Sequence, residues 1–536
     1  MQSDYYILLN EKLKAPRIEI HFPFDWIAVD WCRDLPDRKF HELKSGKFWS
    51  VPASPYHANI LITTVPKISN VTWQIDDRLY SMSETADKLK EAATSLSGRN
   101  LKNLYPFQSA GVRFLQAAGG RAIIGDEMGL GKTVQALTFI RLEKINQTVI
   151  VAPASVIYKW KDEAEKWLPS EFSAEVVPSS KSALPPTRLL IMSYTIATLR
   201  YRDIEKLKPE LIIFDEVHYL KGQADKVKRV RAALSYSQSV PYILGLSGTP
   251  FLNRPIELFN ILNLLSPSTW NSWWDYAKRY CDMDPVYGPA GPNGVRGSSN
   301  REELAERLKM IMIRRTKKEV LDQLPDLNRV IMPVKIKMKD YHEAIKADVP
   351  TLVKINLMRQ AAGAGKVAPA IEWSQNFLET SNDKLVIYCH HHEVVDRVVS
   401  ALESYVVGVI SGKVSNKERH RLITKFQNEL RPRVLVITSA GGEGIDLFSK
   451  SDKFECNSLL FVEREWSPLY EEQVEARLHR NGQRSAVTAY YLSALNTIDQ
   501  HFAEMVEEKR EVFKEVVGSD TIETIVKNEL IERIGL

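Results

Sequence analysis

Ten short apolar runs, arranged in two series of five, constrain the fold of this chain more than any other feature. The first series is 121–125, 148–154, 188–194, 210–216 and 242–248, and the second is 384–390, 405–411, 433–439, 458–464 and 488–494. Longer helix-compatible stretches separate the runs. Because buried strands of parallel sheets are almost continuously apolar and are joined by crossover helices, this alternation predicts an α/β chain with two tandem lobes.

The segments outside the two series complete the domain organisation. A length of 536 residues exceeds what one hydrophobic core supports. Residues 1–100 hold four of the eleven tryptophans in short pieces broken by proline and turn signals, which predicts a small α+β module. The first lobe is expected over 101–330 with a helical protrusion at about 266–312, and the second over 331–500 with a protrusion at about 340–380. Residues 501–536 are expected to form C-terminal helices.

Composition excludes several other classes of protein. The apolar fraction of 44% argues against disorder, and 25 glycines and 26 prolines are ordinary numbers. No apolar run is long enough to cross a membrane, and the start of the chain does not resemble a secretory signal. The four cysteines lack metal-ligand spacing, which predicts reduced thiols. We therefore expect an intracellular monomer without membrane contact, in the cytoplasm or nucleoid of a prokaryote or virus, or in a eukaryotic nucleus.

A glycine-rich turn directly follows the first apolar run. It reads Gly125-Asp126-Glu127-Met128-Gly129-Leu130-Gly131-Lys132-Thr133, and a helix-compatible stretch comes next. Between a strand and a helix, backbone N–H groups of such a turn surround a phosphate, Lys132 reaches the β- and γ-phosphates, and Thr133 binds Mg²⁺. The general pattern has glycine where this chain has Asp126, so the short motif alone leaves a chance turn open.

Two adjacent carboxylates end the fourth run of the first series. Asp215 and Glu216 follow the apolar segment LIIF. An aspartate in this position can hold the magnesium ion that bridges nucleotide phosphates, and the neighbouring glutamate can orient and deprotonate the attacking water. The alternative is a solvated acidic turn, which the upstream phosphate loop disfavours.

The second series lacks a phosphate loop and offers two arginines instead. Arg477 and Arg480 are three residues apart, so we expect them on one face of a helix. Positive charge from an opposing lobe would stabilise the γ-phosphate during hydrolysis. Taken alone, the pair is also typical of a surface helix with salt bridges.

Together these segments resemble the motifs of superfamily-two helicase-like ATPases, and within them the Swi/Snf group of double-stranded-DNA translocases. PFQ resembles the adenine-reading motif, with Gln108, and DEMGLGKT is the group's usual form of motif I, which accounts for Asp126. Motifs Ia, II, III, V and VI are matched in order by VAPASVIYKWKDEAEKW, DEVH, LSGTP, SAGGEGIDL and EWSPLYEEQVEARLHRNGQ. The resemblance implies two RecA-like lobes, with ATP and Mg²⁺ bound by the first.

The resemblance also implies a role for each matching residue. The implied catalytic residues are Lys132, Asp215, Glu216, Arg477 and Arg480, and the implied metal ligands are Thr133 and Asp215. The implied nucleotide-binding residues are Gln108, Gly129, Gly131, Lys132, Thr133, Gly444 and Asp446. Coupling of nucleotide to DNA is expected from His218, Ser247, Thr249 and Gln473. Sequence-blind contacts to DNA phosphates are expected from Pro153, Ser155, Ser193, Tyr194, Gly412, Lys413, Thr438 and Ser439.

Some positions depart from the family pattern or refine it. Asp446 stands where the family often has asparagine, and Asn481 stands where isoleucine is frequent.

Residues 312–325 resemble the annealing-helicase or HARP-type branch, and we interpret the basic stretch from Arg314 to Lys318 as lobe-linking structure. Residues 22–52 resemble in outline the HARP module that precedes such motors, although an ordinary small domain with a tryptophan core is an equal alternative.

The resulting hypothesis is an ATP-driven translocase on duplex DNA that anneals strands, reverses forks or migrates branches. Two other motor functions stay open, which are remodelling of protein-DNA complexes and strand separation. A DNA-binding scaffold with an inactive ATPase is disfavoured because Lys132, Asp215, Glu216 and both arginines are present. Protein partners cannot be inferred from these residues.

Overall fold

The computed structural model describes residues 5–12, 15–43, 46–68, 71–96, 101–221, 227–236, 238–248, 255–283, 295, 299–320, 325–438, 445–449, 453–466, 468–480 and 482–505. The chain divides into two compact units. The first contains Met1–Glu127, Gly131–Ala152 and Ala164–Thr316, and the second contains Met128–Leu130, Pro153–Glu163 and Lys317–Leu536. None of the described helices combines the length and the apolar character that a membrane span requires.

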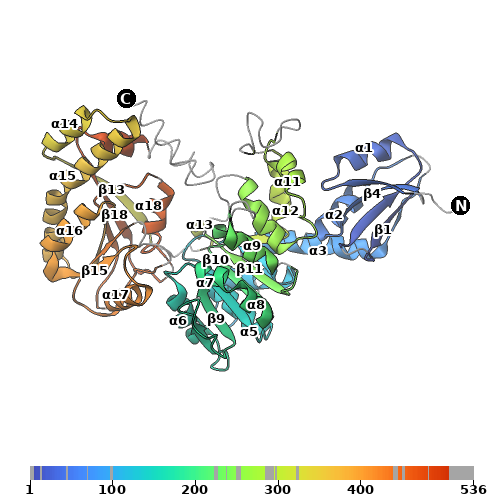
Figure 1. The fold of residues 1–536 in the computed structure, drawn as a ribbon, viewed down its shortest axis with the longest axis horizontal. Helices are drawn as coiled ribbons and strands as arrows, with labels where there is room; N and C mark the ends of the chain where they lie inside the picture. Colours follow the sequence, from blue (N-terminus) through green and yellow to red (C-terminus); the bar gives the residue numbers. More distant parts are fainter. Residues whose placement is uncertain are drawn as a thin grey trace. The chain divides into compact units, whose positions relative to one another are not determined.

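The N-terminal module is a five-stranded sheet covered by helices (Figure 1). Its strands are β1 (Tyr6–Asn10), β2 (Arg17–His21), β3 (Lys39–Leu43), β4 (Gly46–Pro52) and β5 (Gln74–Ile75), in the order β3-β4-β2-β1-β5. Its helices are α1 (Trp26–Asp34), α2 (Pro55–Thr64) and α3 (Asp77–Thr94). Residues of β1 and β2 alternate between buried and half-buried, so one face of the sheet forms a core of its own with α2 and α3.

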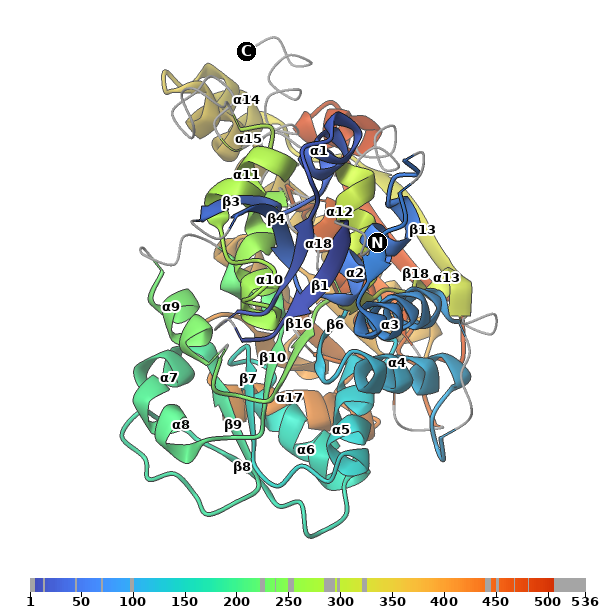
Figure 2. The ribbon, with the colours of Figure 1, turned by 90° about the vertical axis from the view of Figure 1, so that its right-hand side faces the viewer.

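The first lobe is a seven-stranded parallel sheet with helices. Its strands are β6 (Arg121–Ile124), β7 (Thr148–Ala152), β8 (Ala174–Val176), β9 (Leu189–Ser193), β10 (Leu211–Asp215), β11 (Tyr242–Leu246) and β12 (Met312–Ile313), in the order β12-β6-β11-β10-β7-β9-β8. Its helical elements are α4 (Pro106–Ala117), α5 (Lys132–Leu142), α6 (Ile157–Trp167), α7 (Tyr194–Leu199), α8 (Tyr201–Leu207), η1 (Val217–Leu220) and α9 (Lys228–Ser235). Figure 2 shows α3 of the module beside α4 of this lobe, and the two helices are in contact.

A helical protrusion leaves the first lobe after β11. It comprises η2 (Pro255–Leu258), α10 (Phe259–Leu265), α11 (Trp273–Tyr280) and α12 (Arg301–Leu308). Buried residues of these helices, such as Leu262, Tyr280 and Leu308, belong to the same apolar cluster as Ile123 and Phe214 of the sheet. The protrusion is therefore an extension of the lobe's core.

The second lobe is a six-stranded parallel sheet in the order β13-β18-β17-β14-β16-β15. The strands are β13 (Leu327–Val334), β14 (Leu385–Tyr388), β15 (Val406–Ile410), β16 (Val434–Ile437), β17 (Ser458–Phe461) and β18 (Val487–Ala494). The helical elements are α13 (Lys317–Val320), α14 (Lys339–Lys346), α15 (Thr351–Thr380), α16 (His392–Ala401), η3 (Glu403–Tyr405), α17 (Asn416–Asn428) and α18 (Pro468–Glu475), and residues 498–505 are also helical. Apolar clusters lie on both faces of the sheet, as expected for parallel strands.

The predicted fold class is confirmed, because all ten apolar runs form strands of two parallel sheets. Three further strands, β8, β12 and β13, complete the sheets. The first two have three and two residues, which is too short for a periodic signal. β13 lies at an edge and is largely exposed, so its sequence LNRVIMPV does not show the continuous apolar character of the inner strands.

Candidate nucleotide site

The phosphate loop joins β6 to α5, as its sequence predicts. Gly129 and Gly131 have φ angles of 91° and 78°, a region that favours glycine. Gly131 caps α5, and a Cβ atom at this position would lie 2.5 Å from Nε2 of Gln108. Nζ of Lys132 donates a hydrogen bond of 2.8 Å to the carbonyl oxygen of Asp126. The structure therefore brings Gln108, Gly131 and Lys132 together at the N-terminus of α5.

Asp126 is buried beneath this loop and forms a bidentate ion pair with Arg315. Nε of Arg315 lies 2.9 Å from Oδ1 and Nη2 lies 2.5 Å from Oδ2 of Asp126, and both side chains are about 1% exposed or less. The same guanidinium donates to Oε1 of Gln135 and to the carbonyl oxygen of Phe107. Arg315 follows β12 and is not among the predicted site residues. It lies in the basic stretch from Arg314 to Lys318, which the sequence indicates only as a link between the lobes.

The acidic pair lies at the carboxyl end of β10, as its position after LIIF predicts. Glu216 has a φ of 51°, a left-handed conformation that is uncommon outside glycine and is typical of functional turns. Oγ of Ser247 lies 3.5 Å from Oε2 of Glu216 and 3.1 Å from Nδ1 of His218. Ser247 follows β11, so two neighbouring strands bring together one predicted catalytic residue and two predicted coupling residues.

Tyr194, a predicted phosphate contact, packs inside the first lobe against the acidic turn. Its side chain is 7% exposed, and its hydroxyl donates to the carbonyl oxygens of Asp215 and Glu216 at 2.9 and 3.3 Å. Burial, with the nearby carboxylates of Asp215 and Glu216, raises the pKa of this phenol well above its ordinary value. The preceding Ser193 is also buried and caps α7. The side chain of Tyr194 thus holds the acidic turn in place from within the lobe, and its contact with DNA phosphates stays a prediction.

In the second unit, two predicted nucleotide-site residues are joined directly. The guanidinium of Arg480 forms an ion pair with the carboxylate of Asp446, which also lies 2.7 Å from Nζ of Lys159. Arg477 is 6% exposed, and its carbonyl oxygen accepts a hydrogen bond from the backbone N–H of Leu447. The segment after α18 is thus attached to residues 446 and 447.

The expected helix through the two arginines is wrong. Helix α18 ends at Glu475, and both Arg477 and Arg480 lie in the turns that follow. Backbone N–H groups of Arg477 and Leu478 bond to carbonyl groups only three residues earlier, and Gly482 has a φ of 99°. The chain tightens at this point and reverses before β18, so the two arginines do not share a helical face.

Carboxylates within α18, which no sequence motif marks as functional, anchor this segment. Arg464 forms two hydrogen bonds with Glu471, at 3.0 and 2.7 Å, and both side chains are buried. Arg329 of β13 does the same with Glu475, at 2.6 Å for each bond. Predicted residue Gln473 lies on the same helix between these anchors. Two glutamates four residues apart are typical of a solvated helix face, so their spacing does not indicate a buried role.

The remaining candidates for DNA contact lie at the ends of strands. Pro153 and Ser155 follow β7, Gly412 and Lys413 follow β15, and Thr438 follows β16. Gly412 and Lys413 are exposed, whereas Thr438 is buried. The predicted residues Thr249, Ser439 and Gly444 lie outside the described residues.

Comparison with known proteins decides the family. Residues 105–382, more than half of the chain, match the SNF2-related domain, and residues 369–482 match the helicase conserved C-terminal domain. The chain belongs to the SNF2-related family. The Swi/Snf resemblance drawn from the motifs is therefore confirmed for this SNF2-related protein.

Several curated relatives carry one of two names. A SWI/SNF-related matrix-associated actin-dependent regulator of chromatin subfamily A-like protein 1 homolog of Caenorhabditis elegans is 31% identical, with coverage of 97% of this chain and 78% of the relative. The DNA annealing helicase and endonuclease ZRANB3 of Homo sapiens is 30% identical, with coverage of 84% of this chain and 43% of the relative. The SNF2-related chain thus spans less than half the length of the human relative.

Among solved structures, the Sulfolobus solfataricus SWI2/SNF2 ATPase core in complex with dsDNA is similar at 23% identity. The alignment has a TM-score of 0.38 and covers 80% of this chain and 96% of that chain.

The residues of the first lobe fit a nucleoside triphosphate and a magnesium ion. Gly129 and Gly131 leave the loop without side chains at two positions, and Lys132 and Thr133 begin the helix that follows. A hydroxyl and a carboxylate are hard oxygen ligands of the kind Mg²⁺ takes alongside phosphates and waters. Among the described residues, no group of three or more His, Cys, Asp or Glu side chains forms a metal cage.

Proposed function

We propose that this SNF2-related chain is an ATP-driven translocase on duplex DNA that remodels branched DNA by strand annealing, fork reversal or branch migration. The observation that carries the proposal is the contact between Glu216, Ser247 and His218. It joins the proposed general base to two side chains that can respond to the presence of ATP. The name of the human relative, a DNA annealing helicase, supports the choice of branched DNA.

The chemistry assigns a separate task to each residue. Lys132 neutralises charge on the β- and γ-phosphates of ATP, and the N–H groups at the start of α5 bind phosphate oxygens. Glu216 orients the attacking water and accepts its proton. Magnesium, when bound by Thr133 and Asp215, offsets the charge that develops on the phosphates. Arg477 and Arg480 of the second lobe stabilise the transferring phosphoryl group when the lobes close.

Binding to DNA is proposed to use the phosphate backbone, so it is sequence-blind and salt-sensitive. Exposed Lys413, beside Gly412, supports this role. We assign the fork preference to the N-terminal module. Its aromatic cavity of about 450 Å³ is lined by residues that include Phe24, Phe40 and Trp49, with the cations Arg33 and Lys47 at the same cavity. Aromatic faces beside cations suit unpaired bases with their phosphates.

The test is the steady-state ATPase rate without DNA, with single strand, with blunt duplex and with a model fork. Wild-type protein is expected to respond more strongly to the fork than to the duplex, and Lys132→Ala is expected to be inactive on all of them. No ATPase on any DNA would overturn the motor, whereas equal stimulation by fork and duplex would overturn the preference for branched DNA.

A second candidate is remodelling of protein-DNA complexes, which the chromatin-regulator name of the Caenorhabditis elegans relative favours. Displacement of a protein roadblock from duplex DNA, with no activity on naked forks, would select this function.

A further inference from the structure

Arg307 holds a buried charge where the N-terminal module meets the helical protrusion. It lies in α12 and is 2% exposed. Nη2 lies 2.5 Å from Oδ2 of Asp37 in the module, and Nη1 donates to the hydroxyl of Tyr280 at 2.8 Å. The guanidinium carbon lies 3.7 Å from the ring centroid of Trp270, which is a close cation–π contact.

Asp37 is held in an unusual conformation to meet this arginine. Its φ is 56°, in the left-handed region. Its carboxylate also lies 3.3 Å from Nε2 of the buried His57. Burial by itself raises the pKa of Asp37, but the charge of Arg307 and the contact with His57 outweigh burial and hold the pKa well below its usual range. Asp37 is therefore a carboxylate, and its partner charge comes from another part of the chain.

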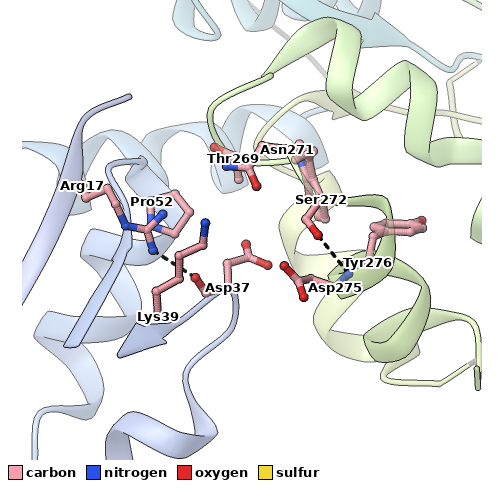
Figure 3. A pocket seen from close by; sticks show the side chains of 10 residues that line it. Arg17, Asp37, Lys39, Pro52, Thr269, Asn271, Ser272, Asp275 and Tyr276 are labelled. Carbon is pink, nitrogen blue, oxygen red and sulfur yellow. Dashed lines mark hydrogen bonds between the residues drawn. The ribbon is translucent and has the colours of Figure 1, made fainter. Parts of the chain in front are cut away.

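The surroundings of this pair are closely packed. Figure 3 shows Arg17 and Lys39 of the module facing Asp275 of α11, around a cavity of about 20 Å³. That volume accommodates about one water molecule, so it is too small for a ligand. A guanidinium N–H of Arg17 also donates to the carbonyl oxygen of Asp37, at 3.2 Å. The contact thus serves to join two structural parts.

The two joined parts have separate apolar cores. Ile18, Ile20 and Leu79 belong to the core of the module, whereas Trp270 and Tyr280 belong to the core of the first lobe. A buried ion pair gains little net stability over apolar packing, but its geometry is specific and removal of one partner leaves a buried charge. The pair is suited to fixing one orientation between two bodies.

We propose that Arg307 is a positioning residue that fixes the N-terminal module to the first lobe, so that the module engages branched DNA in register with the motor. This inference rests on the proposed function, in which the module recognises the branch. The partners of Arg307, which include Asp37, Trp270 and Tyr280, are not among the residues proposed for the nucleotide or DNA sites. Loss of Arg307 is expected to separate ATP hydrolysis from the response to branched DNA. The ATPase site keeps all its residues, whereas the module loses its fixed orientation.

The experiment compares Arg307→Met, Arg307→Lys and Asp37→Asn in the full chain. Lys309→Met is the matched control, because Lys309 follows the same helix but pairs with Glu306 at the surface. Dyes on cysteines introduced at exposed Lys12 and Lys206 report the distance between module and lobe by single-molecule energy transfer. The four native cysteines are buried, so the introduced thiols label selectively.

Arg307→Met is expected to broaden the distance distribution and to reduce fork stimulation about tenfold, with the duplex-stimulated ATPase within about twofold of wild type. Arg307→Lys retains the charge and is expected to restore part of the fork response, which loss of folding alone would not produce. A distance distribution in Arg307→Met and Asp37→Asn identical to that of wild type would overturn the inference. Equal responses of the wild type to fork and duplex would overturn the proposed function. The distance measurement would then still test whether Arg307 fixes the module to the first lobe.

Discussion

Arg315 reaches from the strand that precedes the second lobe to Asp126 at the base of the phosphate loop, and the two side chains form a buried bidentate ion pair. The pair explains why an aspartate replaces the glycine of the general phosphate-loop pattern. The loop gains a fixed anchor, and the anchor also holds Phe107 beside the predicted adenine contact, Gln108.

Removal of one partner of this pair should destabilise the first lobe strongly. Arg315→Met leaves the Asp126 carboxylate buried without its cation, and breaking such a pair costs about 3–5 kcal/mol. Replacement of both, as Asp126→Leu with Arg315→Met, should recover most of that loss. Chemical unfolding followed by hydrogen exchange in α5 measures the effect. The anchor would be unimportant if Arg315→Met unfolded at the same denaturant concentration as wild type.

Glu216→Gln should abolish hydrolysis while leaving nucleotide binding intact. The amide cannot accept the proton of the attacking water, and loss of a general base costs roughly 10²–10⁴-fold in rate. Rapid-quench measurement of phosphate release and a fluorescent-nucleotide titration separate the two effects. Glu210→Gln, just before the other end of β10, is the matched control and should hydrolyse ATP normally. Normal turnover by Glu216→Gln would remove Glu216 from the mechanism.

Ser247→Ala should weaken the link between DNA and hydrolysis. The hydroxyl contacts both Glu216 and His218, which also lie 3.3 Å from each other, so its loss removes one of the two contacts that join the catalytic carboxylate to the histidine. We expect basal ATPase within about twofold of wild type and stimulation by DNA reduced at least about fivefold. The surface change Ser239→Ala serves as the control. An unchanged response to DNA in Ser247→Ala would exclude this coupling route.

Acid should destabilise the second lobe through Glu463. Burial raises the pKa of this carboxyl, but the hydrogen bond and charge of His391 outweigh burial and place its pKa below the ordinary 4.5. A group with a lowered pKa in the folded state stabilises the fold above its unfolded pKa, and this stabilisation is lost as the pH falls through the folded value. Glu463→Gln should therefore flatten the loss of stability below about pH 4.5. Hydrogen exchange in β14 and β17 as a function of pH tests this, and identical profiles would contradict it.

Prediction from sequence succeeded where function or folding depends on local pattern. The ten strands and the phosphate loop each occupy consecutive residues with a period or a spacing that physical chemistry explains. Arg307 and Arg315 could not be found this way, because their partners lie 270 and 189 residues away. In the helix REELAERL, Arg307 reads as part of a charged, solvated face, and only the tertiary structure buries it. The end of α18 was missed because the turn after Glu475 has no proline and its glycine comes seven residues later.

The chain passes from the first compact unit to the second for the last time between Thr316 and Lys317. Only one residue separates Arg315 from that crossing point, so the anchor of the phosphate loop lies at the end of the last segment of the first unit. Mechanical tension along the backbone at this crossing would therefore be transmitted to the Asp126–Arg315 pair at the base of the phosphate loop. A mechanical load on the chain would thereby change the affinity of the phosphate loop for nucleotide, although no residue that contacts the nucleotide is altered.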